Sequence, residues 1–102
     1  MLKVVSLLKR KETLSLEDFR TWALEEHPQL GKKLPGMRHY CMSVVLKDDP
    51  ELPYHAVSEF WFDDNDARIA AFGTPEGKAA AEDAAAHCSS RVHLLTEEKI
   101  II

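Results

Sequence analysis

The sequence predicts an α+β domain in which two helices cover one face of a four-stranded antiparallel sheet. Apolar runs typical of strands alternate with amphipathic stretches typical of helices, in the order strand, helix, strand, strand, helix, strand. The 102 residues are expected to form one domain, residues 1–102, which is long enough for a single core. In the first three strands both alternating sets of side chains are largely apolar, so both faces of the sheet are expected to be covered.

Four segments have the composition of strands. The first spans residues 2–9, and its two largely apolar faces are typical of a central strand. The second, third and fourth are expected at residues 37–46, 55–63 and 91–97. Residues 47–54 hold two prolines and three acidic residues, so they are expected to form a loop. Because both faces of these strands are apolar, the pattern leaves open which face meets the helices.

The first helix is expected to begin after Ser15, because Ser15 and the acidic residues that follow it fit a capping box. Apolar residues at three- and four-residue spacing then form one inward stripe, which Trp22 and Leu24 flank. Pro28 disfavours helical geometry at the residue before it, so the helix is expected to bend or stop at His27. The members of the stripe are Leu16, Phe19, Ala23 and His27.

The second helical region is expected in two parts. Residues 63–66 offer several N-caps for a short helix through about Phe72, which Gly73 ends. Thr74 and Pro75 then begin a second helix that contains six alanines between residues 79 and 86. These small side chains either permit close packing on the sheet or leave a cavity beneath the helix. The pattern does not decide between the two.

With right-handed crossovers, the order βαββαβ gives the ferredoxin-like arrangement. The two helices cover only one face of its sheet. The other face would expose an apolar patch larger than monomers tolerate, so we expect a second copy to pack against it, sheet to sheet, as a homodimer. The apolar tail, residues 99–102, is available to take part in this contact.

Composition argues against several classes of partner. The net charge is −4 and the basic residues are scattered, so no nucleic-acid partner is expected. The N-terminal apolar run is too short and too broken by lysine for a signal peptide or a membrane span, and no membrane partner is expected. The two cysteines show no CxxC spacing, which favours a cytoplasmic protein with reduced thiols.

Neither a metal site nor a cofactor site is expected. The five histidines form no HExxH or His-x-His motif, and no compact carboxylate cluster accompanies them. The four glycines match neither the GxGxxG fingerprint nor a phosphate-binding P-loop. We therefore expect any chemistry to depend on side chains of the chain itself.

His27 is the first candidate for such chemistry, because a histidine at an inward helix end can act as an acid or a base near neutral pH. The alternative is a structural histidine that satisfies helix-end carbonyls. His39 and Tyr40 are candidates for positioning a substrate oxygen. His55 and His93 also lie on expected strands, where packing or surface roles are more common than chemistry. A cavity beside His27 would suit a small apolar or aromatic ligand. The expected lining residues are Phe19, Ala23, Ser58, Phe60, Trp61 and Phe62.

Five segments together resemble the EthD family. The resemblance lies in the order and spacing of the segments and runs nearly from end to end. They are residues 1–11, residues 14–20 followed by Glu26-His27-Pro28, the Leu-Pro-Gly-x-x-x-Tyr segment 34–40, residues 58–63, and Thr74-Pro75-Glu76-Gly77.

This resemblance implies a dimeric α+β-barrel fold. Relatives in the same superfamily include methylmuconolactone isomerases, polyketide cyclases and dehydratases, and cofactor-free monooxygenases, and His27 corresponds to the histidine of the family's helix-end motif. The first hypothesis is a cofactor-independent enzyme that acts on a cyclic or aromatic metabolite by acid/base chemistry. The alternative is a non-catalytic dimer that binds a hydrophobic small molecule or delivers it to a degradative oxidase. A structural dimer with a filled core is the third.

Overall fold

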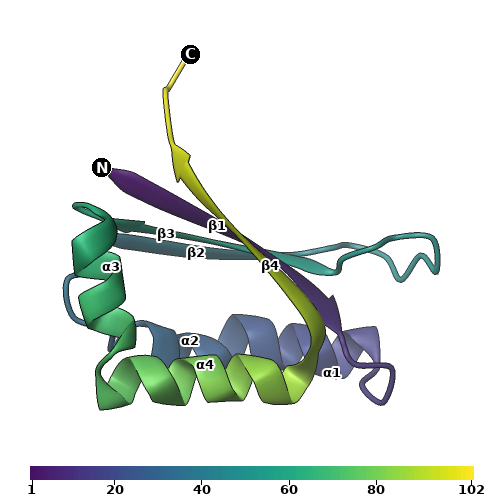
Figure 1. Cartoon of the computed structure of the whole chain (residues 1–102). Coiled ribbons are helices and arrows are strands. Elements are labelled where there is room, and N and C mark those ends of the chain that lie inside the picture. Colours follow the sequence, from purple (N-terminus) through teal and green to yellow (C-terminus); the bar gives the residue numbers. More distant parts are fainter.

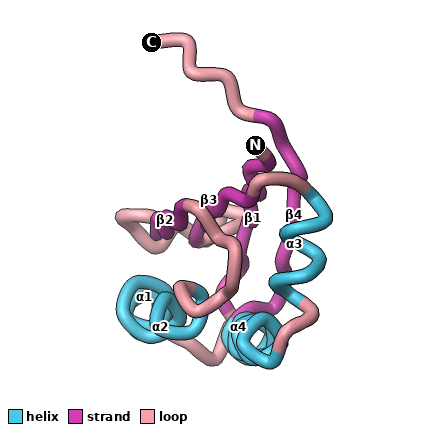
Figure 2. The backbone as a smooth tube through the Cα atoms, turned by 90° about the vertical axis from the view of Figure 1, so that its left-hand side faces the viewer, coloured by secondary structure: helices cyan, strands magenta, loops and turns pink.

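The structure is a computed structural model that describes residues 1–102. Its helices lie on one side of a four-stranded sheet, as Figures 1 and 2 show from two directions. The order of elements confirms the expected ferredoxin-like α+β fold. The elements are β1 (Leu2–Arg10), α1 (Leu16–Thr21), the π-helical turn η1 (Trp22–Glu26), α2 (His27–Gly31), β2 (His39–Val44), β3 (Ala56–Phe62), α3 (Asn65–Phe72), α4 (Pro75–His87) and β4 (Cys88–Glu97).

The sheet has the strand order β2-β3-β1-β4, and every neighbouring pair is antiparallel. Ser6 of β1 lies opposite Ser58 of β3 on one side and His93 of β4 on the other. Partners in a register share a face, so these three side chains form one row across the sheet. Val4 and Ser6 are almost fully buried, which places this face against the helices. The structure thereby decides the face that the sequence pattern left open.

The first helical region changes its geometry just before Pro28, where a bend or a stop was expected. It does not stop at His27 but continues to Gly31. The N–H of His27 donates to the carbonyl of Trp22, five residues back, which makes a π turn just before Pro28. Because proline lacks an N–H, it cannot continue the ordinary ladder, and the wider turn accommodates it. The extra residue in the turn brings Trp22 onto the buried face, not to its flank, and leaves Leu24 exposed.

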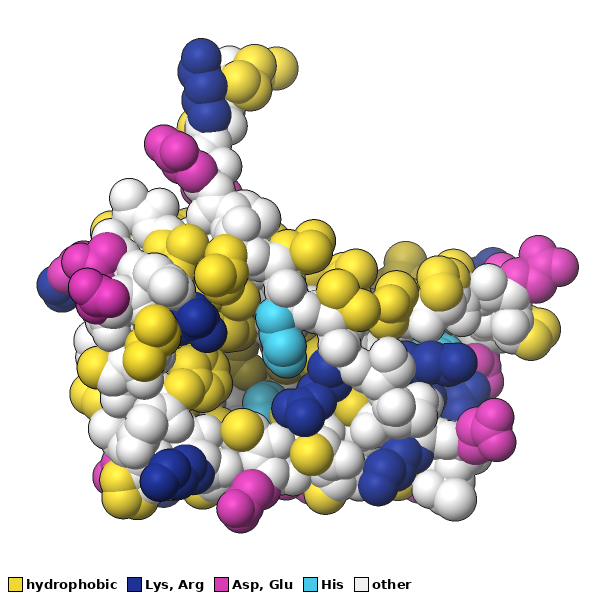
Figure 3. Space-filling view, viewed as in Figure 1, with side chains coloured by type: hydrophobic (Ala, Val, Ile, Leu, Met, Phe, Trp, Pro, Cys, Tyr) yellow, Lys and Arg dark blue, Asp and Glu magenta, His cyan; other side chains and the backbone are white.

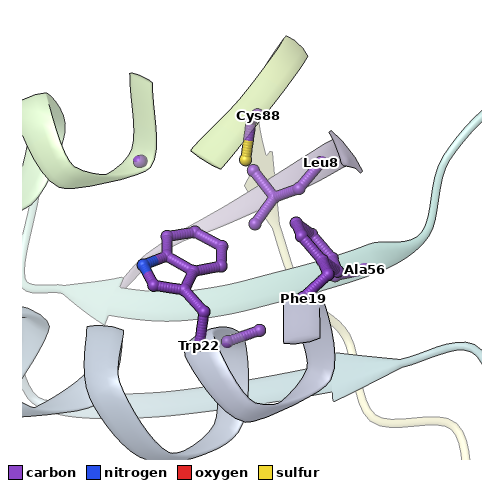
Figure 4. Packing of buried hydrophobic residues seen from close by; sticks show 7 residues of the cluster. Leu8, Phe19, Trp22, Ala56 and Cys88 are labelled. Atoms are coloured by element: carbon purple, nitrogen blue, oxygen red, sulfur yellow. The ribbon is translucent and has the colours of Figure 1, made fainter. Parts of the chain in front are cut away.

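Two apolar clusters fill most of the space between the helices and the sheet. The first joins Phe19 and Trp22 of the first helical region to Leu8 and Cys88, the strand residues above them (Figure 4). Burial raises the pKa of the Cys88 thiol to about 11, as expected for a core cysteine. The second cluster lies toward the α3 end. It contains Val4, Leu34, Phe60, Phe62, Ala71 and Ala80.

Several boundaries differ from those expected. β2 spans His39–Val44 and is shorter at both ends than the expected residues 37–46; before it, Gly36 adopts a positive φ of 77°. β4 begins at Cys88 and not at residue 91, so it follows α4 without a loop. No helix of the structure combines the length and the apolar character that crossing a bilayer requires.

The second face of the sheet carries no helix. Its central side chains are apolar or only half-buried, and Leu94 is 47% exposed. Glu59 on this face forms an ion pair with Lys3 at 2.7 Å. The tail extends away from the domain, and Ile100 to Ile102 are almost fully exposed (Figure 1). The apolar residues of this face are Val5, Leu7, Val57, Trp61, Val92 and Leu94.

Candidate functional site

A cavity of about 220 Å³ lies between the sheet and the helices, beside the second core cluster. Small side chains leave this space: Ala80, Ala81 and Ala84 of α4 face Ser6 and Ser58 of the sheet across it. Of the two interpretations of the alanine-rich helix, the one with a cavity is therefore confirmed. Figure 3 shows the hollow with histidine side chains (cyan) inside it and basic side chains (dark blue) beside it.

His27 lines this cavity and is held by Asp83 of α4. The distance from His27 Nδ1 to Asp83 Oδ2 is 2.8 Å, and the His27 side chain is mostly buried. A carboxylate accepts and does not donate, so Nδ1 of His27 carries the proton of this bond. In the neutral ring, Nε2 then keeps its lone pair and is available to take a proton from a bound molecule.

Trp22 fixes both members of this pair. Its indole N–H donates to the same Oδ2 of Asp83 at 2.9 Å. Its ring contacts two imidazoles, with its centroid 4.8 Å from that of His27 and stacked 4.5 Å from that of His87. His87 in turn donates from Nδ1 to the backbone carbonyl of Asp83 at 2.7 Å. The π turn that buries Trp22 therefore also orients His27.

A second histidine lies on the sheet side of the cavity. The Oγ of Ser6 is 2.7 Å from Nδ1 of His93, its neighbour across β1 and β4. The pKa of His93 is lowered, first by burial and then by the charges of Arg91 and Arg68. His93 is therefore neutral at pH 7. Both arginines line the cavity as well.

Tyr40 completes the polar lining. Its ring lies so close to Gly31 that a β-carbon there would be only 2.9 Å from the tyrosine ring. Gly31 thus makes the room that lets Tyr40 face the cavity. Burial raises the pKa of the Tyr40 hydroxyl to about 12, so it stays protonated and can donate a hydrogen bond.

The structure brings together only part of the expected site. His27, Tyr40, Ser58 and Phe60 line the cavity. His39 does not, because the strand register puts it beside Trp61 on the opposite face, at a ring distance of 4.9 Å. The expectation for both of these residues is therefore corrected.

Three other expected lining residues belong to the core. Phe19 and Ala23 are fully buried in the first cluster, and Phe62 is fully buried in the second. They fill space and do not border the cavity. His55 also has a structural role, because its Nδ1 accepts a hydrogen bond from the backbone N–H of Arg10.

Sequence reasoning missed Asp83, Arg68 and Arg91. Asp83 did have a signal, because it stands three residues after Ala80 and four before His87, on the side of α4 that faces the sheet. Nothing local marks the arginines. They meet the cavity only because α3 and β4 border it.

The family model of the EthD domain matches residues 11–88, which is most of the chain. The chain belongs to the EthD domain family. The resemblance seen in the sequence is thus confirmed. A search of curated proteins finds no match.

Solved structures support the same conclusion for this EthD-domain protein. An EthD family protein from Bacillus halodurans matches with a TM-score of 0.81 and 25% identity, covering 97% of this chain and 99% of that one. A dimeric ferredoxin-like protein of unknown function from Thermobifida fusca has a TM-score of 0.76 and 18% identity, covering 93% and 88%. A hydroxynitrile lyase from Passiflora edulis has a TM-score of 0.73 and 15% identity, covering 97% and 95%. The last two likenesses concern the fold alone.

Proposed function

We propose that this EthD-domain protein is an enzyme that moves a proton on a small cyclic or aromatic metabolite, with His27 as the acid and base. One observation carries the proposal: His27 lines a mostly apolar cavity while Asp83 holds its Nδ1 at 2.8 Å. A histidine that only satisfied the helix end would bond to backbone carbonyls, whereas this one bonds to a carboxylate on another helix. The fold supports the proposal to the extent that a hydroxynitrile lyase shares it.

The chemistry follows from the hydrogen-bond roles. Nε2 of His27 takes a proton from a carbon next to a carbonyl, and the Asp83 carboxylate stabilises the imidazolium that forms. The Tyr40 hydroxyl, which stays protonated, donates to the oxygen on which negative charge develops. His27 then returns the proton to another carbon, which completes an isomerisation, or to a leaving oxygen, which completes a dehydration. Asp83 acts through His27 and is a positioning residue.

Cyclohex-3-enone tests this chemistry, because its isomerisation to the conjugated cyclohex-2-enone needs only one base and produces an ultraviolet signal. We expect the purified protein to catalyse the reaction, and His27→Ala to lower the rate by about 10²–10⁴-fold. His39→Ala is the matched control, since His39 lies on the other face, and it should keep the rate. Equal rates for wild type and His27→Ala would contradict the proposal, provided circular dichroism shows that both proteins are folded.

A carrier that binds or delivers a hydrophobic molecule to an oxidase remains the second candidate, and the mostly apolar cavity wall favours it. The two candidates differ in what His27 is for. Native mass spectrometry at gentle and then harsh declustering energies detects a retained adduct on freshly purified protein. If the protein is a carrier, His27→Ala should still retain the adduct. If it is an enzyme, the same substitution should abolish turnover.

We also propose that the chain forms a homodimer through the helix-free face of the sheet. The apolar side chains there need a cover, and the solved Thermobifida neighbour is described as dimeric. Leu94→Glu places a charge in that face and should give a monomer in light scattering. Leu46→Glu is the matched control, because Leu46 is 90% exposed in a loop, and it should stay dimeric. A wild-type monomer would contradict this part of the proposal.

A further inference from the structure

Two arginines beside the cavity lack carboxylate partners. Arg10 forms an ion pair with Asp48, and Arg38 forms one with Asp63. Arg68 and Arg91, in contrast, make only neutral contacts: Arg68 Nε donates to the Asn65 side chain at 2.8 Å, and Arg91 Nη1 donates to the Ala81 carbonyl at 3.3 Å. Each guanidinium keeps further N–H groups free. Both residues line the cavity, and the charges of both act on His93.

His93 adds a third donor to the same region. The buried Ser6 hydroxyl has one hydrogen-bond partner, Nδ1 of His93. A buried hydroxyl that failed to donate would cost free energy, so Ser6 donates and Nδ1 accepts. Nε2 of His93 therefore carries the proton. Arg68, Arg91 and His93 together present only donors, and no aspartate or glutamate lines the cavity.

We propose that the site recognises a small single-ring carboxylate, whose carboxylate group binds Arg68 and Arg91 while its ring occupies the apolar cavity. This names a substrate class for the site and rests on the proposed function. The volume of the cavity is consistent with a single-ring ligand, since an apolar cavity of about 150 Å³ holds benzene in another protein. The 220 Å³ found here has room for a ring with a small substituent. His27 lines the same cavity, so a ring bound there lies beside its imidazole.

A carboxylate fits this site better than a phosphate. Phosphate sites are commonly built from backbone N–H groups at helix N-termini. Here the two nearby helix starts are already capped, α3 by Asp64 at 2.8 Å from the N–H of Ala67 and α4 by Thr74 at 3.1 Å from the N–H of Gly77. Two guanidinium groups without such backbone N–H donors can still bind a carboxylate bidentately.

Benzoate and its neutral isostere benzamide test the proposal by NMR titration of the wild-type protein. We expect saturable binding of benzoate, tighter than that of benzamide by roughly tenfold or more, because charge-assisted hydrogen bonds form with benzoate alone. Arg91→Gln and Arg68→Gln should each remove most of this preference, because they weaken benzoate binding more than benzamide binding. Arg38→Gln is the matched control, because Arg38 does not border the cavity, and it should keep the preference.

Three outcomes would overturn the proposal. The first is equal affinity for benzoate and benzamide, and the second is tighter binding of phenyl phosphate than of benzoate. The third is the absence of a saturable chemical-shift change with benzoate, 2-furoate or cyclohexanecarboxylate up to about 20 mM. That concentration exceeds a dissociation constant of about 1 mM, which even weak specific binding reaches. His27→Gln separates this proposal from the acid/base function. It should abolish turnover of cyclohexenone and leave the benzoate preference intact.

Discussion

The space between α4 and the sheet is filled by side chains at one end and open at the other. At the α1 end, Phe19 and Trp22 pack beneath Leu8 in the first core cluster and do not border the cavity (Figure 4). Toward α3, alanines of α4 and Gly31 meet serines of the sheet, and about 220 Å³ stays open. The backbone layers are the same at both ends. The difference in side-chain volume makes one end core and leaves a cavity at the other.

The largest effect is expected at the filled end. Phe19→Ala removes a fully buried ring, so we expect a loss of roughly 3–5 kcal/mol in the free energy of unfolding. Urea denaturation followed by circular dichroism measures it. Tyr40→Phe is the control at the open end, where removing only a hydroxyl should change stability by less than about 1.5 kcal/mol. Equal losses at the two ends would contradict the comparison.

Asp83→Asn tests the open end as a site. The neutral amide no longer stabilises an imidazolium on His27, and we expect the isomerisation rate to fall by about 10²-fold or more. Glu82→Gln is the matched control, because it removes one negative charge, as Asp83→Asn does, but on the exposed side of α4. Steady-state kinetics across pH checks both variants. A rate for Asp83→Asn within twofold of wild type would mean that the carboxylate only supports the fold.

Filling the cavity is expected to have a smaller effect. Ala80→Leu places a larger side chain in the cavity. We expect the benzoate affinity to fall by about tenfold, because the leucine side chain occupies volume that the benzoate ring needs. Stability should stay within about 1.5 kcal/mol of wild type, because the added carbons enter a void. Ala79→Leu is the control on the exposed side of α4. Calorimetry and denaturation measure the two quantities.

The smallest effect concerns pH. His93 and His55 have pKa values below their ordinary value of 6.5, mainly because of burial. The unfolded chain then binds more protons than the folded one, so stability falls as pH drops from about 7 toward the lowered pKa values. His93→Gln should flatten this slope in thermal melts between about pH 7 and 5. A slope that stays unchanged in both His93→Gln and His55→Gln would contradict the assignment.

The sequence predicts the scaffold well, because alternation, caps and turn residues are local. Ser15, Asp64 and Thr74 cap helices as expected, and Gly36 takes the positive φ that ends the turn before β2. The site is predicted less well. Neighbouring strand residues such as His39 and Tyr40 lie on opposite faces, but two equally apolar faces gave no means of telling which of them meets the helices.

Two features that decide the site are not local. The π turn at Trp22 depends on the proline that follows, and it brings the tryptophan onto the buried face. Asp83 lies 56 residues from His27, and the arginines come from two further elements. Pairings over such distances follow from how the helices pack on the sheet, and spacing within one segment does not reveal them.

The most direct test of the site is a nitrogen-15 NMR measurement of the histidine side chains, with and without benzoate. For His27 we expect the tautomer with the proton on Nδ1 and a free lone pair on Nε2, and a shift of its Nε2 signal when benzoate binds. His39, on the other face, should not respond. A His27 ring protonated on Nε2 alone, or one that does not respond to the bound carboxylate, would contradict the acid/base site proposed here.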